Sequence, residues 1–258
     1  MDLNLTGTRV VVTAGAGGIG LEIARAFVEE GAKVWVCDID PDALTSLSRS
    51  DPSIVAERCD VTDRDGVARF LDHAVADLGG LDCLVNNAGI AGATARVEDT
   101  PPEDWDRCLE VCLTGQFNFA RIAAPMLRES PNGSMLNFSS AAGRFGFALR
   151  SAYAAAKWGV IGFTKSLAIE LGDDGVRVNA ILPGIVAGDR QRRVLEAKAQ
   201  RLGKSFADIE ATAFSYTSIK TYVTARQIAD QVLFLASERG RTISGQAIAI
   251  DGDTKMLA

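Results

Sequence analysis

The chain has 258 residues, of which 47% are hydrophobic and 23% charged, and its formal net charge is −6. This length and hydrophobic content fit one large α/β domain or two small ones, and they argue against a largely disordered chain. Nucleic-acid binding depends on clustered lysines and arginines, so the negative charge argues against a nucleic-acid partner.

Short apolar runs alternate with amphipathic segments along the chain. The runs are typical of buried parallel strands and lie at residues 9–13, 33–37, 54–58, 82–85, 134–138, 176–182 and 247–250. The helical segments between them cover residues 19–30, 41–48, 64–78, 102–128, 152–172 and 226–237. Because parallel strands need crossover connections, this order predicts an α/β fold whose parallel sheet carries helices on both faces. No linker divides the chain, so we expect a single domain over residues 1–258.

Residues 188–224 break this alternation, because they are polar and helical in pattern and contain no strand. Ligands of open α/β sheets bind beyond the carboxyl ends of the strands, and an insertion after the sixth strand lies at that edge. A connection of this length is more often a lid than a packing element. Arg190, Arg192 and Arg193 in this segment either contact an anionic substrate or form a solvated helix face.

Several classes of protein are disfavoured by what the sequence lacks. Residues 1–7 show no secretory signal, and no stretch approaches the ~20 apolar residues of a membrane span, so we expect a cytoplasmic protein without membrane contact. The five cysteines have no accompanying histidines at metal-ligand spacing, so we expect no metal. His73 is the only histidine, which excludes a metal centre built from several histidines.

A glycine-rich turn follows the first strand and opens the first helix. It reads Thr13-Ala-Gly-Ala-Gly-Gly-Ile-Gly20, in which Gly15, Gly17 and Gly20 have the G-x-G-x-x-G spacing. Glycines in such a turn let the backbone approach a pyrophosphate at the helix N-terminus. The motif alone is weak, but its place between a strand and a helix favours a dinucleotide-binding site.

Polar residues follow the next strands at the same edge of the sheet. Asp38, after the second strand, can accept hydrogen bonds from the adenosine ribose and would repel a 2′-phosphate, which favours NAD over NADP. No arginine or lysine stands at positions 16, 17, 39 or 40 to attract such a phosphate. Asp60-Val61 and Asn86 to Gly89 follow the third and fourth strands, and each could also be turn chemistry alone.

Tyr153 and Lys157 are four residues apart and share one face of a predicted helix. An ammonium group close to a phenol stabilises the phenolate, so this tyrosine can act as general base in oxidation and general acid in reduction. Ser140, after the fifth strand, can bind and polarise the reacting oxygen. On their own these residues are common, and such a Tyr-x-x-x-Lys pair is usually only surface.

The motifs taken together resemble the short-chain dehydrogenase/reductase family over nearly the whole chain. The motifs that carry the resemblance are Val12–Gly20, Asp60, Asn86–Gly89, Ser140, Tyr153-Ala-Ala-Ala-Lys157, Asn179 and Pro183-Gly184. The resemblance implies a Rossmann-type sheet of seven strands, NAD(P)(H) as cofactor, and a homotetramer. It assigns proton transfer to Tyr153, support of the phenolate and of the nicotinamide ribose to Lys157, and orientation of the substrate oxygen to Ser140.

The same resemblance implies the residues that hold the cofactor. They are Gly15, Gly17, Gly18, Ile19, Gly20, Asp38, Ile39, Asp60, Val61, Asn87, Ala88, Gly89, Tyr153, Lys157, Pro183, Gly184, Ile185 and Val186. Three positions depart from the family pattern. Ala14 replaces the first glycine, Gly188 replaces a common threonine, and Cys112 replaces an asparagine that helps to hold a water near the lysine. Since a thiol is a weak donor and acceptor, we expect Cys112 to slow proton exchange.

The leading hypothesis is an NAD-dependent dehydrogenase of alcohols, polyols, sugars or hydroxy acids. A 3-oxoacyl reductase of fatty-acid type is a second one, disfavoured by Asp38 and by the negative charge, which suits an acidic carrier protein poorly. A nucleotide-binding regulator that has lost activity is a third, and it is supported only by Cys112. Within the leading hypothesis, the substrate is a small molecule of unknown identity.

Overall fold

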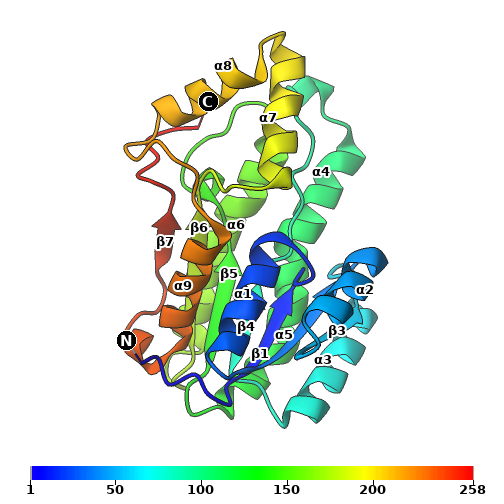
Figure 1. The fold of residues 1–258 in the computed structure, drawn as a ribbon, viewed down its shortest axis with the longest axis vertical. Coiled ribbons are helices and arrows are strands. Elements are labelled where there is room, and N and C mark those ends of the chain that lie inside the picture. The colour runs from blue at the N-terminus through cyan, green and yellow to red at the C-terminus, as the bar shows by residue number, and fades with distance from the viewer. Residues whose placement is uncertain (1, 258) are drawn as a thin grey trace.

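Seven parallel strands form one sheet in the computed structural model of the protein, which describes residues 2–257 (Figure 1). In chain order they are β1 (Arg9–Thr13), β2 (Lys33–Asp38), β3 (Ile54–Arg58), β4 (Cys83–Asn86), β5 (Ser134–Phe138), β6 (Arg177–Pro183) and β7 (Ala247–Ile250). Their spatial order is β3-β2-β1-β4-β5-β6-β7. The order reverses between β1 and β4, which is the switch point where such sheets bind ligands. The predicted doubly wound α/β fold is confirmed.

Helices cover both faces of the sheet. They are α1 (Gly18–Glu29), α2 (Pro41–Ser50), α3 (Arg64–Leu78), α4 (Pro102–Leu109), α5 (Gly115–Arg128), α6 (Ser151–Glu170), α7 (Asp189–Leu202), α8 (Phe206–Ser215) and α9 (Ala225–Ala236). Short 3-10 turns lie at Val97–Asp99, Ala141–Gly143 and Glu238–Gly240. Helices α1, α2 and α9 share one hydrophobic core with the sheet, and α3, α5 and α6 share the other.

The central strands are apolar throughout because both of their faces are buried. In β1, Val10 and Val12 pack into the layer of α1 and α9, whereas Val11 packs into the layer of α3 and α5. Side chains alternate across a strand, so a strand between two helical layers needs apolar residues at every position. This arrangement fixes the carboxyl ends of β1, β4, β5 and β6 at one edge of a rigid sheet.

The helix predicted over residues 102–128 is found at these residues, but it is not α-helical throughout. A π-helical turn, Glu110–Thr114, separates α4 from α5. This turn contains Cys112, and π-turns inside helices are frequent at functional sites.

The predicted insertion after the sixth strand is helical and consists of α7 and α8. Both helices lie beyond the end of the sheet toward which the strand arrows point (Figure 1). The insertion lacks a full strand, although Val223 forms an isolated parallel bridge with Val186 and Thr217 an antiparallel one with Thr254. These bridges tie the base of the insertion to the carboxyl ends of β6 and β7.

Candidate active site

The glycine-rich turn between β1 and α1 is shaped by close packing. A Cβ atom at Gly15 would lie 2.5 Å from Cβ of Val36, and one at Gly20 would lie 2.2 Å from the carbonyl oxygen of Ala14. Both positions therefore exclude any larger residue without a backbone shift. At Gly17 and Gly18 a Cβ atom would meet nothing within 4 Å, so this side of the turn is open. Gly17 is the N-cap of α1, and among the described residues no side chain caps that terminus.

Ala14 adopts a left-handed conformation, with a φ of 50°. Alanine rarely adopts this conformation, which costs about 1–2 kcal/mol relative to the right-handed region. Hydrogen bonds hold the turn in place, since Nδ2 of Asn87 donates to the carbonyl oxygens of Thr13 and Ala14 at 3.0 and 3.1 Å. Oγ1 of Thr13 in turn accepts from the backbone N–H groups of Asn87 and Ala88. Hydrogen bonds between the turn and the end of β4 thus stabilise the conformation of Ala14, which replaces the first glycine of the family motif.

Asp38 lies at the end of β2 beside the glycine-rich turn. Its carboxylate accepts a hydrogen bond from the N–H of Ala16 at 3.2 Å and another from the N–H of Asp40 at 3.2 Å. Ile39 next to it is 49% exposed, which leaves an apolar surface beside the carboxylate. Nε of Arg58 donates to the carbonyl oxygen of Ile39 at 3.4 Å. The structure therefore places a cation near this site that the sequence reasoning missed, because Arg58 comes from the neighbouring strand β3.

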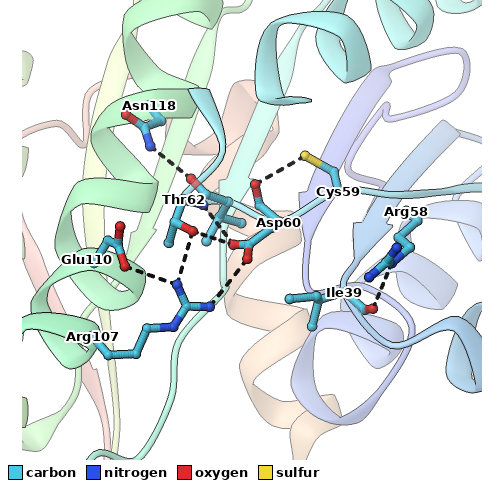
Figure 2. Close-up of polar contacts among 9 residues, drawn as sticks. Ile39, Arg58, Cys59, Asp60, Thr62, Arg107, Glu110 and Asn118 are labelled. Atoms are coloured by element: carbon cyan, nitrogen blue, oxygen red, sulfur yellow. Dashed lines mark hydrogen bonds and ion pairs between the residues drawn. The ribbon is translucent and has the colours of Figure 1, made fainter. Parts of the chain in front are cut away.

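Asp60 is the centre of a polar network on the other side of Ile39 (Figure 2). Its carboxylate accepts from the N–H and the hydroxyl of Thr62 at 2.9 and 2.8 Å, and from Nη2 of Arg107 at 3.3 Å. Burial opposes ionisation, but these donors lower the pKa of Asp60 below its usual value. Nδ2 of Asn118 donates to the carbonyl oxygen of Val61 at 2.9 Å. The loop after β3 is thus fixed from α4 and α5.

Tyr153 and Lys157 lie on the first turns of α6, as the sequence predicted. Nζ of Lys157 is 5.6 Å from the centroid of the Tyr153 ring and donates a hydrogen bond of 2.7 Å to the carbonyl oxygen of Phe138. Lys157 is only 2% exposed. Ser140 follows β5, and its neighbour Ser139 donates to the carbonyl oxygen of Lys157 at 2.7 Å. The end of β5 is therefore tied to the helix that carries the tyrosine and the lysine.

Cys112 is buried in the π-helical turn beside Lys157. Its thiol lies 3.3 Å from the backbone nitrogen and 3.4 Å from the carbonyl oxygen of Ile90. A Cβ atom at Gly89 would be 3.4 Å from Nζ of Lys157 and 3.5 Å from Sγ of Cys112, so both groups border Gly89. The hydrogen bond with the Cys108 thiol lowers the pKa of Cys112, burial opposes this, and the charge of Lys157 adds to the lowering.

The backbone after β6 passes the same edge of the sheet. A Cβ atom at Gly184 would lie 2.6 Å from Cα of Asp251, so only glycine allows this approach between β6 and β7. Pro183 ends β6, and Ile185 and Val186 lead toward α7. Gly188 is the N-cap of α7 with a φ of 139°, a conformation that the threonine common in the family would not adopt readily.

The three predicted arginines of the insertion have different surroundings. Arg192 is exposed and pairs with Glu196 at 2.8 Å on the outside of α7. Arg193 is likewise exposed. Arg190 instead turns toward the sheet, where its Nη1 donates to the carbonyl oxygen of Gly89 at 3.1 Å. The solvated-face interpretation thus fits Arg192 and Arg193, and the site interpretation fits Arg190.

Arg150 belongs to none of the sequence motifs described above. This arginine is only 4% exposed, and its Cζ lies 5.1 Å from the centroid of the Tyr153 ring. It is the N-cap of α6, three residues before the tyrosine, and this closeness in the sequence is the signal that could have identified it. Within residues 2–257, no helix could span a membrane, and no group of three or more potential ligand side chains could hold a metal.

Comparison with known proteins identifies the class of protein that this fold and site define. The sequence profile of the family described as "Enoyl-(Acyl carrier protein) reductase" matches residues 13–253. The chain is 35% identical to the 3-oxoacyl-[acyl-carrier-protein] reductase of Thermotoga maritima, over 97% of this chain and 98% of that protein. It is 34% identical to the D-beta-hydroxybutyrate dehydrogenase of Cupriavidus necator, over 96% and 98% of the two chains.

A solved structure of NAD+-bound xylitol dehydrogenase is similar with a TM-score of 0.91 and 29% identity, covering 96% of this chain and 99% of that one. The protein is therefore an oxidoreductase of hydroxyl and carbonyl groups with a Rossmann-type fold. The chain belongs to the short-chain dehydrogenase/reductase family.

Proposed function

We propose that the protein is an NAD(H)-dependent oxidoreductase that interconverts a secondary alcohol and a ketone, of polyol, sugar or hydroxy acid type. The observation that carries the proposal is the approach of the buried Lys157 ammonium to the Tyr153 ring, 5.6 Å from its centroid, at the carboxyl edge of the sheet. The relatives named above include dehydrogenases of hydroxyl compounds, which supports the reaction class. Direct assay of cofactor absorbance with alcohols and ketones tests the proposal, and a nucleotide-binding regulator would give binding without turnover.

The residues of the turn fit a dinucleotide. The open side of Gly17 and Gly18 and the uncapped N–H groups of α1 suit a pyrophosphate, whose charge is stabilised at a helix N-terminus. Asp38 and Ile39 would hold the adenosine ribose and adenine, with Asp60-Val61 and Asn87-Ala88-Gly89 bordering the same path. Lys157, Ile185 and Val186 would hold the nicotinamide end. When bound, the nicotinamide supplies the acceptor or donor of the hydride.

The side chains of the protein handle the oxygen and its proton. Ser140 binds the reacting oxygen, and Tyr153 takes the hydroxyl proton during alcohol oxidation or returns it during carbonyl reduction. Lys157 stabilises the phenolate by its charge, and its hydrogen bond to Phe138 fixes the ammonium in a buried site where charges act strongly. The insertion of α7 and α8 would cover the substrate, which makes residues 188–224 the proposed lid of a single domain.

The charge of Asp38 predicts the choice of cofactor. NADH is expected to bind about tenfold or more tightly than NADPH, because the carboxylate repels a 2′-phosphate and accepts hydrogen bonds from the ribose. Asp38→Asn is expected to narrow this difference, as measured by fluorescence titration with both cofactors. Asp42→Asn removes the same charge from the first turn of α2 and should leave the ratio unchanged.

A preference for NADPH in the unaltered protein would refute the choice of NAD and would favour the second candidate, a 3-oxoacyl reductase like the relative from Thermotoga maritima. Fluorescence titration of Arg58→Met with NADH and with NADPH shows whether this cation near Ile39 attracts the 2′-phosphate of NADPH. Under the proposal, its removal leaves NADH binding unchanged.

Cys112 is proposed to slow the exchange of the proton with solvent. Cys112→Asn is expected to raise kcat by about threefold to tenfold and to change its pH dependence, because an amide donates and accepts stronger hydrogen bonds than a thiol. The measurement is kcat across pH 6 to 10 for both proteins, and Cys112→Ala, which adds no such group, serves as control. Equal kcat values at every pH would show that the thiol has no part in proton exchange.

The proposed assembly is a homotetramer, in the cytoplasm. Large apolar side chains remain exposed on α5 and α6, where Phe117 is 42%, Trp158 53% and Ile169 82% exposed. Exposed apolar side chains on neighbouring helices are typical of an interface between subunits. This surface lies on helices next to the site, so assembly would also support the position of α6.

A further inference from the structure

Arg150 is a buried cation without a counter-charge. It is 4% exposed, and within the described chain its Nε has no hydrogen-bond partner and its guanidinium no acidic partner within 4 Å. One Nη atom donates to the carbonyl oxygen of Ala91. A buried charge of this kind is costly unless an anion compensates it. The fold therefore buries the charge of Arg150 without supplying an acidic side chain to pair with it.

The surroundings of Arg150 point toward the reacting centre. Its Cζ lies 5.1 Å from the ring centroid of Tyr153 and 5.3 Å from that of Phe147. A group bound to the guanidinium would therefore lie within the length of a small molecule from the tyrosine hydroxyl. The backbone after β4 lies beside both arginines, since the carbonyl oxygen of Gly89 accepts from Arg190 and that of Ala91 accepts from Arg150.

Two further cations gather beside Arg150 from α7. Arg190 donates to Gly89 at 3.1 Å and has no acidic partner within 4 Å among residues 2–257, in contrast to Arg192, which pairs with Glu196. Nζ of Lys198 lies 5.9 Å from the centroid of the Phe147 ring. Burial lowers the pKa of both Arg150 and Lys198; the neighbouring Tyr153 opposes this at Arg150, and the charge of Arg190 adds to the lowering. The whole chain has a net charge of −6, so this cluster of unpaired cations is a local region of positive charge on a negatively charged protein.

We propose that Arg150 and Arg190 bind an anionic group of the substrate, a carboxylate or a similar small oxyanion, so that the substrate is a short hydroxy or oxo acid. The proposal rests on the proposed function and narrows its substrate class. Guanidinium groups bind planar oxyanions through paired hydrogen bonds, and Nε of Arg150 is a buried donor that no group of the described chain uses. Lys198 adds charge at the rim.

The test compares acids with their neutral esters in the purified full-length protein. The probes are 3-oxobutanoate and 4-oxopentanoate with NADH, beside the methyl ester of each. The expected kcat/KM is at least about tenfold higher for the acids, and Arg150→Met and Arg190→Met each lower it about 10- to 100-fold for the acids but not for the esters. The loss is expected mainly in KM. Arg192 lies on the same helix as Arg190, so Arg192→Met is the matched control. It is expected to leave kcat/KM unchanged for the acids and for the esters.

A binding measurement separates this inference from the proposed function. Millimolar 3-hydroxybutanoate is expected to raise the Tm of the unaltered protein, and the methyl ester is not. The shift should be lost in Arg150→Met and in the exposed variant Arg190→Met, whose folding is not in question. No shift in the unaltered protein overturns the inference, even if the esters turn over. A rise in Tm without turnover of any probe supports the inference that the two arginines bind an anion. In that case only the proposed function is refuted.

Two other results would also overturn it. If Arg150→Met lowers kcat/KM equally for acids and esters, the arginine only holds the loop at Ala91. If Arg190→Met weakens NADH binding as much as it weakens binding of the acids, this arginine serves the cofactor phosphates instead of the substrate.

Discussion

Replacing Tyr153 with phenylalanine is expected to lower kcat by about 10²- to 10⁴-fold, because the substitution removes the group proposed to transfer the proton. The ring remains and keeps its contacts with Arg150 and Lys157, whose distances of 5.1 and 5.6 Å are measured to the ring centroid. Cofactor affinity is therefore expected to stay within about threefold. Steady-state kinetics in both directions and a fluorescence titration with NADH measure the two effects.

Tyr216→Phe is the matched control for Tyr153. Tyr216 is the C-cap of α8, so the same hydroxyl is removed from the proposed lid instead of from the helix that carries Lys157. Tyr222 is less suitable because its hydroxyl bonds to Glu210 and its ring packs on Phe214 at 4.9 Å between centroids. A Tyr153→Phe protein with kcat close to that of the unaltered protein would refute the proposed proton transfer, whatever the substrate.

Replacing Lys157 with methionine is expected to lower kcat about 30- to 100-fold and to raise the Kd for NADH. The ammonium supplies a charge worth up to ~4 kcal/mol at about 4 Å in a medium of effective dielectric near 20, and part of it is lost to burial. The loss in kcat is expected because the phenolate that forms during turnover no longer has this positive charge beside it. The measurement is kcat and kcat/KM as functions of pH.

The fold is expected to tolerate this change. The carbonyl oxygen of Phe138, which accepts from Lys157, also accepts from Nε2 of Gln116 at 3.0 Å, so it keeps a partner. Methionine has a similar length and is apolar, which suits a site that is only 2% exposed. Lys165→Met, on the exposed side of the same helix, is the control. Unchanged activity and pH dependence in Lys157→Met would show that the ammonium does not act on the tyrosine.

The strands and most helices could be predicted from the sequence because burial dictates their residues. A strand such as β1 shows its three valines as a continuous apolar run, and the predicted range, 9–13, is the one found. The π-helical turn could not be predicted, because its register depends on how Cys112 and its neighbours pack against Gly89 and α6. The hydrophobic periodicity of the sequence does not report contacts with other elements of the fold.

The candidate site was predictable where residues lie on one element. Tyr153 and Lys157 share α6, and their spacing shows it directly. Arg58 and Arg107 were missed because each reaches the site from another element, and only the folded sheet brings them beside Ile39 and Asp60. Arg150 lies near the tyrosine in sequence, but its burial and its lack of an acidic partner are properties of the packed structure.

The π-turn at Glu110–Thr114 lets one stretch of chain serve two surfaces that face different directions. Each residue advances an α-helix by about 100°, so one additional residue in a turn rotates everything after it by that angle. Upstream of the turn, Cys108 packs with Ala152 and Ala156 of α6. Downstream, the apolar side of α5 lies against the sheet and α3. A straight helix of the same sequence would orient only one of these sides correctly, so the distortion beside Lys157 is also what aligns the helix with the core.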